Sequence, residues 1–230
     1  MTIEDKGRRS RQHIFETAMA QFAERGFAQV TMRDVAQAAG CSLGLAYKYF
    51  ASKEELVLAL YALLAEEFVA ETRRLPAGTL AERFAAAMTL KCELLAPHRR
   101  TLGALVAAAL DPSSEIAVLG ARSSEVRARV TEGFRAVVDG AADAPPPAHR
   151  ARLTAALYAA HLLIVLVCMH DRSPRLRSTR AAIELVRDLL ALFGPSLGHE
   201  RAQAALKRLD GVLAPLIHPP REVEREKEPS

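Results

Sequence analysis

Residues 31–53 carry the pattern that most constrains this chain: two short helical stretches joined by a tight turn. Thr31 can cap the first stretch, and Asp34 can reciprocate as a short-armed capping partner. Gly40 lies where the chain must turn, because a residue without a Cβ tolerates the backbone that ends a helix. Ser42 can then cap a second stretch of about two turns. A pair of this size has the turn chemistry of a helix-turn-helix, whose second helix enters the major groove of DNA.

Basic residues concentrate in the same part of the chain. Residues 1–53 hold eight Lys/Arg and five Asp/Glu, a net charge of +3 out of +4 for the whole sequence. A positive surface there would attract phosphates and make binding depend on salt concentration. The charge placement is therefore consistent with a nucleic-acid partner, although an imbalance of this size alone is weak support.

Composition predicts an all-α fold. Half of the 230 residues are hydrophobic, so the chain can bury a sizeable core. No run of alternating β-branched residues is long enough for a strand. We expect a three-helix helix-turn-helix domain over residues 1–53, with a frayed start at 1–10. A larger helical domain for effector binding and dimerisation is expected over 54–217, and a disordered, charged tail over 218–230.

Breaks at Gly and Pro separate the expected helices. Ser52 and Glu55 have the spacing of a capping box that opens a long helix to about residue 73. That helix would join the two domains rigidly, because no flexible linker separates them. The other helices are expected at 11–25, 79–96, 98–110, 113–142 with a break near 120, 148–170, 179–193 and 199–217.

The most apolar run of the chain is residues 153–169. Its 17 residues fall short of the ~20 that a helix needs to span a bilayer, and His161 lies near its middle. The N-terminus is polar and lacks the apolar segment of a signal peptide. We therefore expect a helix buried on most sides, in a cytoplasmic protein without a membrane partner.

The sequence contains no motif for catalysis, and we expect no enzyme, no cofactor and no metal site. Cys41, Cys92 and Cys168 are scattered and form neither a disulfide framework nor metal-ligand spacing. The histidines show no His-x3-His pair, and there is no G-x-S-x-G motif or Gly-rich phosphate loop. Cys41 lies near a helix N-terminus that lowers thiol pKa values, but a small buried turn residue is the favoured interpretation.

Three motifs follow one another in fixed register over residues 14–56. The first, I-x3-A-x3-F-x3-G-F, comprises Ile14, Ala18, Phe22, Gly26 and Phe27. The second, T-x-R-D-[IV]-A, comprises Thr31, Arg33, Asp34, Val35 and Ala36. The third, A-G-x-S-x-G-x-x-Y-x-Y-F-x-S-K-E-E-L, runs from Ala39 to Leu56. This segment resembles the TetR family of one-component transcriptional regulators, whereas the rest of the chain is similar only in being helical and apolar.

The resemblance implies a homodimer that binds a palindromic operator, usually as a repressor, and releases it when a small molecule enters the larger domain. It also implies the residues that contact double-stranded DNA. These are Thr31, Arg33, Ser42, Leu43, Gly44, Leu45, Tyr47, Lys48, Tyr49 and Lys53. Their chemistry fits, because phenolic hydroxyls and lysine suit phosphate oxygens. At least one tyrosine and Lys48 should face outward on the second helix.

Leu43 and Leu45 depart from the polar or small groups that the family often places there. Leucine cannot form the bidentate hydrogen bonds that discriminate bases, although it can touch a thymine methyl. Direct readout would then depend on Arg33 and methyl contacts, together with DNA shape. The alternative is that Leu43 or Leu45 packs on the first helix, and the sequence leaves both open.

The apolar helices at 153–169 and 179–193 lie where the family's dimer interface usually forms. The second carries Ile183, Val186, Leu190 and Phe193 close to a heptad seam. An intramolecular hairpin is the alternative. Two nearly all-apolar helices leave more surface than one core needs, which favours dimerisation.

The effector pocket is the least determined feature. Its expected lining is Phe68, Phe84, Met88, Cys92, Leu105 and His161. Ordinary core packing is the alternative for each of these residues. An apolar, fatty or steroid-like effector fits an Ala/Leu/Val-lined cavity better than a flat aromatic cation, since the chain has no Trp.

A helical module that contacts only proteins is the competing function, but it would not need Arg33, Lys48 and Lys53 on one small domain.

Overall fold

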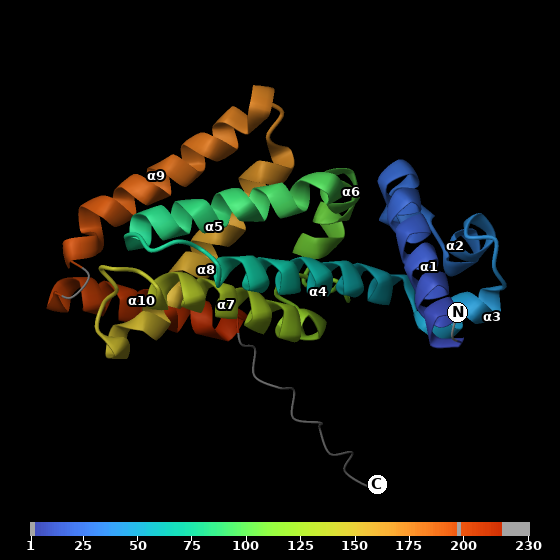
Figure 1. The fold of residues 1–230 in the computed structure, drawn as a ribbon, viewed down its shortest axis with the longest axis horizontal. Helices are drawn as coiled ribbons and strands as arrows, with labels where there is room; N and C mark the ends of the chain where they lie inside the picture. The colour runs from blue at the N-terminus through green and yellow to red at the C-terminus, as the bar shows by residue number, and fades with distance from the viewer. Residues whose placement is uncertain (1–2, 197–198, 218–230) are drawn as a thin grey trace, which may run out of the picture.

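The computed structural model describes residues 3–196 and 199–217, which form helices and no strand (Figure 1). The all-α prediction is confirmed for this part of the chain. The helices are α1 (Ile3–Arg25), α2 (Met32–Ala38), α3 (Leu43–Tyr49), α4 (Lys53–Thr72), α5 (Leu80–Leu95), α6 (Arg99–Leu110), α7 (Ser124–Asp139), α8 (Pro147–His170), α9 (Arg177–Phe193) and α10 (Glu200–Ile217). Short 3₁₀ turns follow α1, α5 and α9 and precede α7 and α9.

The helices α1, α2 and α3 form a small unit at one end of the molecule, and α4 runs from it into the larger body (Figure 1). The local signals act as expected: Thr31 and Asp34 form a reciprocal capping box at the start of α2, and Ser42 caps α3. Gly40 follows α2 at φ +62°, in the left-handed region that glycine adopts without strain.

Two hydrophobic cores meet along α4. Leu56, Leu60 and Leu64 belong to the core of the N-terminal unit, whereas Phe68, one turn further, belongs to the core of the larger body. The N-terminal core also takes in Leu105 of α6. Because one helix contributes to both cores, a shift in the larger body reaches the N-terminal unit through a packed element rather than through a loose hinge.

The helix α6 fastens α1 to the larger body. The two helices pack against each other, and the buried hydroxyl of Thr101 donates a hydrogen bond to the carbonyl oxygen of Met19, at 3.1 Å. Arg122, in the turn before α7, forms an ion pair with Glu55 of α4, at 3.6 Å. The N-terminal unit is therefore held from two directions, along α4 and across α6.

Buried polar side chains fix the helices of the larger body. Arg83 of α5 donates to the carbonyl oxygens of Val137 and Ala136 on α7, both at 3.0 Å. Asp171 accepts hydrogen bonds from the amide and hydroxyl of Thr179, both at 2.8 Å, and so links the end of α8 to the start of α9. Each contact satisfies groups that would be costly to leave unpaired in a core.

The structure corrects three sequence predictions. α1 begins at Ile3, so the segment expected to be frayed is helical from there on. The helix expected from 113 begins only at Ser124, because Asp111 turns the chain by binding the amide and hydroxyl of Ser113. Only half of the capping box at the start of α4 forms. The hydroxyl oxygen of Ser52 accepts from the amide of Glu55, but the Glu55 carboxylate accepts from the amide of Ala51, at 2.8 Å, instead of that of Ser52. The predicted disordered tail lies outside the described residues.

The helix α8 is long and apolar enough to cross a membrane by length and composition, with 39% of its most apolar window buried. The expectation of a helix buried on most sides is thus only partly met. Its inner face packs against α7, α9 and α10, while Leu163, Leu166 and Val167 stay exposed. Such an exposed apolar stripe on a helix that otherwise packs in a core is typical of an interaction surface.

Candidate DNA-binding surface and effector domain

The outer face of α3 presents polar groups on a short helix. Tyr47 is 49% exposed, and Ser42, Gly44 and Lys48 are exposed as well. The prediction that one tyrosine and Lys48 face outward is confirmed. Tyr49 is half-buried and packs on the N-terminal core.

The two unusual leucines differ in position. Leu43 is half-buried and packs against the N-terminal core, which matches the alternative that it serves packing. Leu45 is half-buried too, but it is not among the described residues that pack on that core. Only Leu45 is therefore placed to offer methyl contacts without first leaving a packed position.

Arg33 and Thr31 both lie at the start of α2, but only the side chain of Thr31 is held by hydrogen bonds. Arg33 is exposed, and its guanidinium makes no hydrogen bond or ion pair to the described residues. The hydroxyl of Thr31 accepts from the amide of Asp34 at 3.3 Å and donates to its carboxylate at 2.5 Å. The hydrogen bond from the Thr31 hydroxyl to this carboxylate, a second one from the Thr31 amide at 2.8 Å, and a contact with Arg25 lower the pKa of Asp34 to about 2. Thr31 thus shapes the helix start, whereas Arg33 is available to a partner.

The ammonium of Lys53 is engaged inside the N-terminal unit. It donates to the carbonyl oxygens of Phe27 at 2.9 Å and Val30 at 3.2 Å. It also lies 4.3 Å from the centroid of the Phe27 ring. Its predicted contact with a phosphate stays a prediction, because in the free protein the side chain ties α4 to the segment between α1 and α2.

Replacing Lys53 by methionine is expected to lower the free energy of unfolding by roughly 1.5 kcal/mol or more, since two hydrogen bonds from a charged donor are lost. Chemical denaturation of the purified chain measures the effect. Lys48→Met is the matched control, because Lys48 is exposed and should leave the stability unchanged. If Lys53→Met were as stable as the wild type and lost only DNA binding, its role would be a phosphate contact alone.

Five of the six predicted effector residues come together in the larger body. Phe68, Phe84 and Met88 are fully buried in one core with Cys92. His161 is 4% exposed, and its ring centroid lies 5.1 Å from that of Phe134 in the same core. Leu105 does not join them, because α6 carries it into the N-terminal core beneath α1. Their role in binding an effector stays a prediction.

The imidazole of His161 is held neutral. Its Nδ1 lies 2.7 Å from the carbonyl oxygen of Tyr158, so in the neutral ring Nδ1 carries the proton and Nε2 is an acceptor. Burial, together with the nearby charge of Lys91, lowers the pKa of His161 to about 3.

Cys92 of α5 contacts Cys168 of α8. Cys92 is the donor in the hydrogen bond between the two thiols, so its pKa is raised, whereas the pKa of Cys168 is lowered.

Sequence reasoning missed Lys91. It lies on α5, is only 6% exposed, and places Nζ 4.7 Å from the centroid of the Phe68 ring. The sequence does indicate that Lys91 is buried, because at helical spacing it lies on the same apolar face as Phe84 and Met88. A lysine at such a position is normally assigned to a solvated face, which hides it from pattern analysis.

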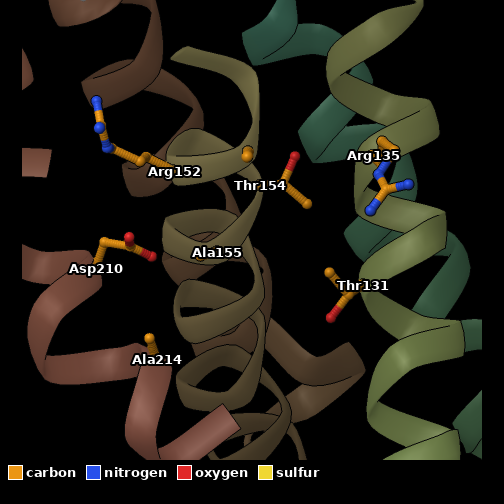
Figure 2. A pocket seen from close by; sticks show the side chains of 8 residues that line it. Thr131, Arg135, Arg152, Thr154, Ala155, Asp210 and Ala214 are labelled. Atoms are coloured by element: carbon orange, nitrogen blue, oxygen red, sulfur yellow. The ribbon is translucent and has the colours of Figure 1, made fainter. Parts of the chain in front are cut away.

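A second site that the sequence did not indicate is a cavity of about 200 Å³ between α7, α8 and α10 (Figure 2). Its lining is Thr131, Arg135, Ala151, Arg152, Thr154, Ala155, Asp210 and Ala214. In Figure 2, Thr131 and Arg135 on α7 lie across the cavity from Asp210 and Ala214 on α10. It contains none of the six predicted effector residues.

Apolar side chains project from α8 and α9 into solvent. The largest exposed fractions are those of Leu163 on α8, at 67%, and Leu192 and Leu185 on α9, at 68% and 61%. Phe193, at the end of α9, is 54% exposed. The two helices pack side by side, so these residues can form one continuous surface of the kind that a second chain covers.

Comparison with known proteins agrees with this arrangement. Residues 14–60 match the family model described as bacterial regulatory proteins, tetR family. The chain is 51% identical over 47 residues to the HTH-type transcriptional repressor KstR2 of Mycobacterium tuberculosis, which is 20% of this chain and 24% of that relative. The match thus spans about a quarter of the length of that curated relative.

Solved structures extend the likeness to the whole fold. A tetR-family transcriptional regulator from Streptomyces coelicolor superposes with a TM-score of 0.60 at 23% identity, over 93% of this chain and 91% of that one. Thermus thermophilus FadR, a repressor solved in complex with lauroyl-CoA, gives a TM-score of 0.52 at 20% identity, over 80% of this chain and 94% of that one. Residues 14–60 therefore match the tetR family of bacterial regulatory proteins, and the chain as a whole has a fold similar to that of these solved regulators.

Proposed function

We propose that this protein is a ligand-responsive transcriptional repressor that binds operator DNA as a homodimer. The observation that carries the proposal is the α2–α3 unit, which presents Arg33, Tyr47 and Lys48 outward without hydrogen bonds or ion pairs to other described side chains. Cations left unpaired on a helix-turn-helix suit a polyanion. The names of the curated relatives, which are repressors, support the direction of regulation.

Recognition in this proposal divides between two helices. Arg33 reaches a base edge or a phosphate from the start of α2, while Tyr47 and Lys48 bind phosphates from α3. Leu45 contributes a methyl contact, and the remaining specificity comes from the shape of the duplex. The position of Leu43 in the N-terminal core supports giving it a packing role.

The exposed faces of α8 and α9 pair the two copies. A twofold dimer presents its two α3 helices to half-sites of opposite orientation, so the operator is a palindrome. Burying leucines such as Leu163 and Leu192 supplies the free energy of association, because each is mostly exposed in the single chain.

An apolar effector enters the larger body and acts through α4. Phe68 lies in the core of that body and Leu64 in the core of the N-terminal unit, so a change in packing near Phe68 shifts the helix that holds α3. The lauroyl-CoA complex of the structural neighbour FadR supports an effector with a long apolar part. The protein acts in the cytoplasm, where operator and effector meet.

Selection of bound duplexes from random-sequence DNA tests this function, with the full chain run with and without cell extract. We expect an enriched inverted repeat whose half-site centre prefers thymine, where Leu45 lies against the methyl group. Loss of binding in the extract would report the effector. Recovery of no enriched sequence would refute the DNA-binding function, and an absent thymine preference would refute the methyl contact.

A further inference from the structure

Lys91 is the one lysine that α5 places in the core of the larger body, next to the expected effector residues. It is 6% exposed, and its Nζ lies 4.7 Å from the centroid of the Phe68 ring. Across the described residues, its ammonium forms no ion pair and no hydrogen bond with a carboxylate. Among the described residues, the interaction that its charge makes is the cation–π contact with the Phe68 ring, and this attraction is weaker than an ion pair.

A buried ammonium without a counter-charge is costly, so its retention calls for a reason. Burial lowers the pKa of Lys91 to about 8, which still leaves the amine mostly protonated at pH 7. The positive charge therefore persists inside the core. Aromatic contact with Phe68 offsets part of the cost, and no oxygen of the described residues accepts a hydrogen bond from Nζ.

The surroundings define the charge and polarity that a ligand would need. His161 is neutral and contributes an acceptor at Nε2 rather than a second cation. Phe84, Met88 and Phe134 supply apolar surface in the same core as Phe68. A single positive charge in an apolar environment is complementary to one negative charge on an otherwise apolar molecule.

We propose that Lys91 is the anchor for the head group of a monocarboxylate effector with a long apolar tail. The proposal rests on the function proposed above and names the chemical class of its ligand. The carboxylate replaces the Phe68 ring as the partner of Nζ, and the ion pair is stronger than one on the surface because the side chain of Lys91 is only 6% exposed. Displacing Phe68 then moves α4, whose preceding turn carries Leu64 in the N-terminal core.

Dodecanoate and dodecanol test the head group on the unmodified full chain, because they share the tail and differ in charge. Isothermal titration should give a dissociation constant at least tenfold lower for dodecanoate. Equal affinities would overturn the proposal, as would failure of decanoate, dodecanoate and hexadecanoate all to bind. This comparison needs no variant and so does not depend on the folding of one.

Lys91→Met tests the residue, since methionine keeps the length and removes the charge. We expect dodecanoate to bind at least tenfold more weakly, dodecanol to bind as before, and the unliganded Tm to stay equal or rise. Lys207→Met, an exposed change on α10, is the control and should behave as the wild type. Retained dodecanoate affinity, or a lowered Tm with no loss of affinity, would make Lys91 a purely structural residue.

Binding of the wild type to the selected operator separates the two proposals. If DNA binds and dodecanoate does not, only the role of Lys91 fails. If no DNA sequence is enriched while dodecanoate still binds through Lys91, the carboxylate site stands and the proposed repressor function fails.

Discussion

Replacing Arg33 and Lys48 together by alanine is expected to weaken operator binding by at least about 100-fold while leaving Tm unchanged. A base contact and a phosphate contact together are worth roughly 3 kcal/mol. Both side chains are exposed and make no ion pair among the described residues, so their loss should not unfold the N-terminal unit. Fluorescence anisotropy with the selected duplex at several salt concentrations measures the loss.

The double variant Lys207→Ala with Arg208→Ala is the matched control, because it removes the same charge from exposed positions on α10 at the far end of the molecule (Figure 1). Its affinity should stay within about threefold of the wild type, and its salt dependence should match. The Arg33/Lys48 variant should show a shallower salt slope. Unchanged affinity in that variant would favour the alternative in which the helix-turn-helix serves protein contacts.

Replacing Leu163 and Leu192 together by glutamate is expected to convert the proposed dimer to a monomer. Each leucine is more than 60% exposed in the single chain, at 67% and 68%, and would be covered at the α8–α9 interface. Each lost burial removes roughly 1.5–3 kcal/mol, and a carboxylate without a partner in an apolar contact adds further cost. Light scattering after gel filtration should show the mass fall to that of one 25.0 kDa chain.

Leu110→Glu is the control for the dimer, because Leu110 is 60% exposed but lies on α6, which is not one of the two helices of the proposed interface. That variant should remain dimeric and bind DNA normally. The Leu163/Leu192 variant should also lose operator affinity, since a monomer contacts only one half-site. A wild-type protein that is monomeric, or a double variant that stays dimeric, would contradict the proposed interface.

The structure of the N-terminal unit could be predicted from the sequence because it depends on interactions between residues close together in the chain. The capping partners Thr31 and Asp34, the turn glycine Gly40 and the cap Ser42 each act within a few residues along the chain. Such interactions need no knowledge of the rest of the fold. The same holds for the apolar runs that became α5, α8 and α9, because their periodicity is a property of the segment itself.

Other features depend on which helices meet. Leu105 was expected beside the effector, but α6 packs under α1 and carries it into the other core. The segment 113–123 was expected to be helical, yet Asp111 binds Ser113 and the chain turns instead. Lys53 was expected at a phosphate, whereas two carbonyl oxygens more than twenty residues away accept its hydrogen bonds.

The sequence by itself determined the helix-turn-helix, the all-α class and the outward-facing Lys48, whereas the structure decided that the outward-facing tyrosine is Tyr47 rather than Tyr49. Only the tertiary structure decided that Leu43 packs inward, that α4 is shared by two cores, and that Lys91 is buried against Phe68. The physical reason is the separation along the chain of the residues that interact. Caps, turns and helical periodicity act over one or two turns of chain, whereas burial and charge pairing are set by neighbours that the sequence places far apart.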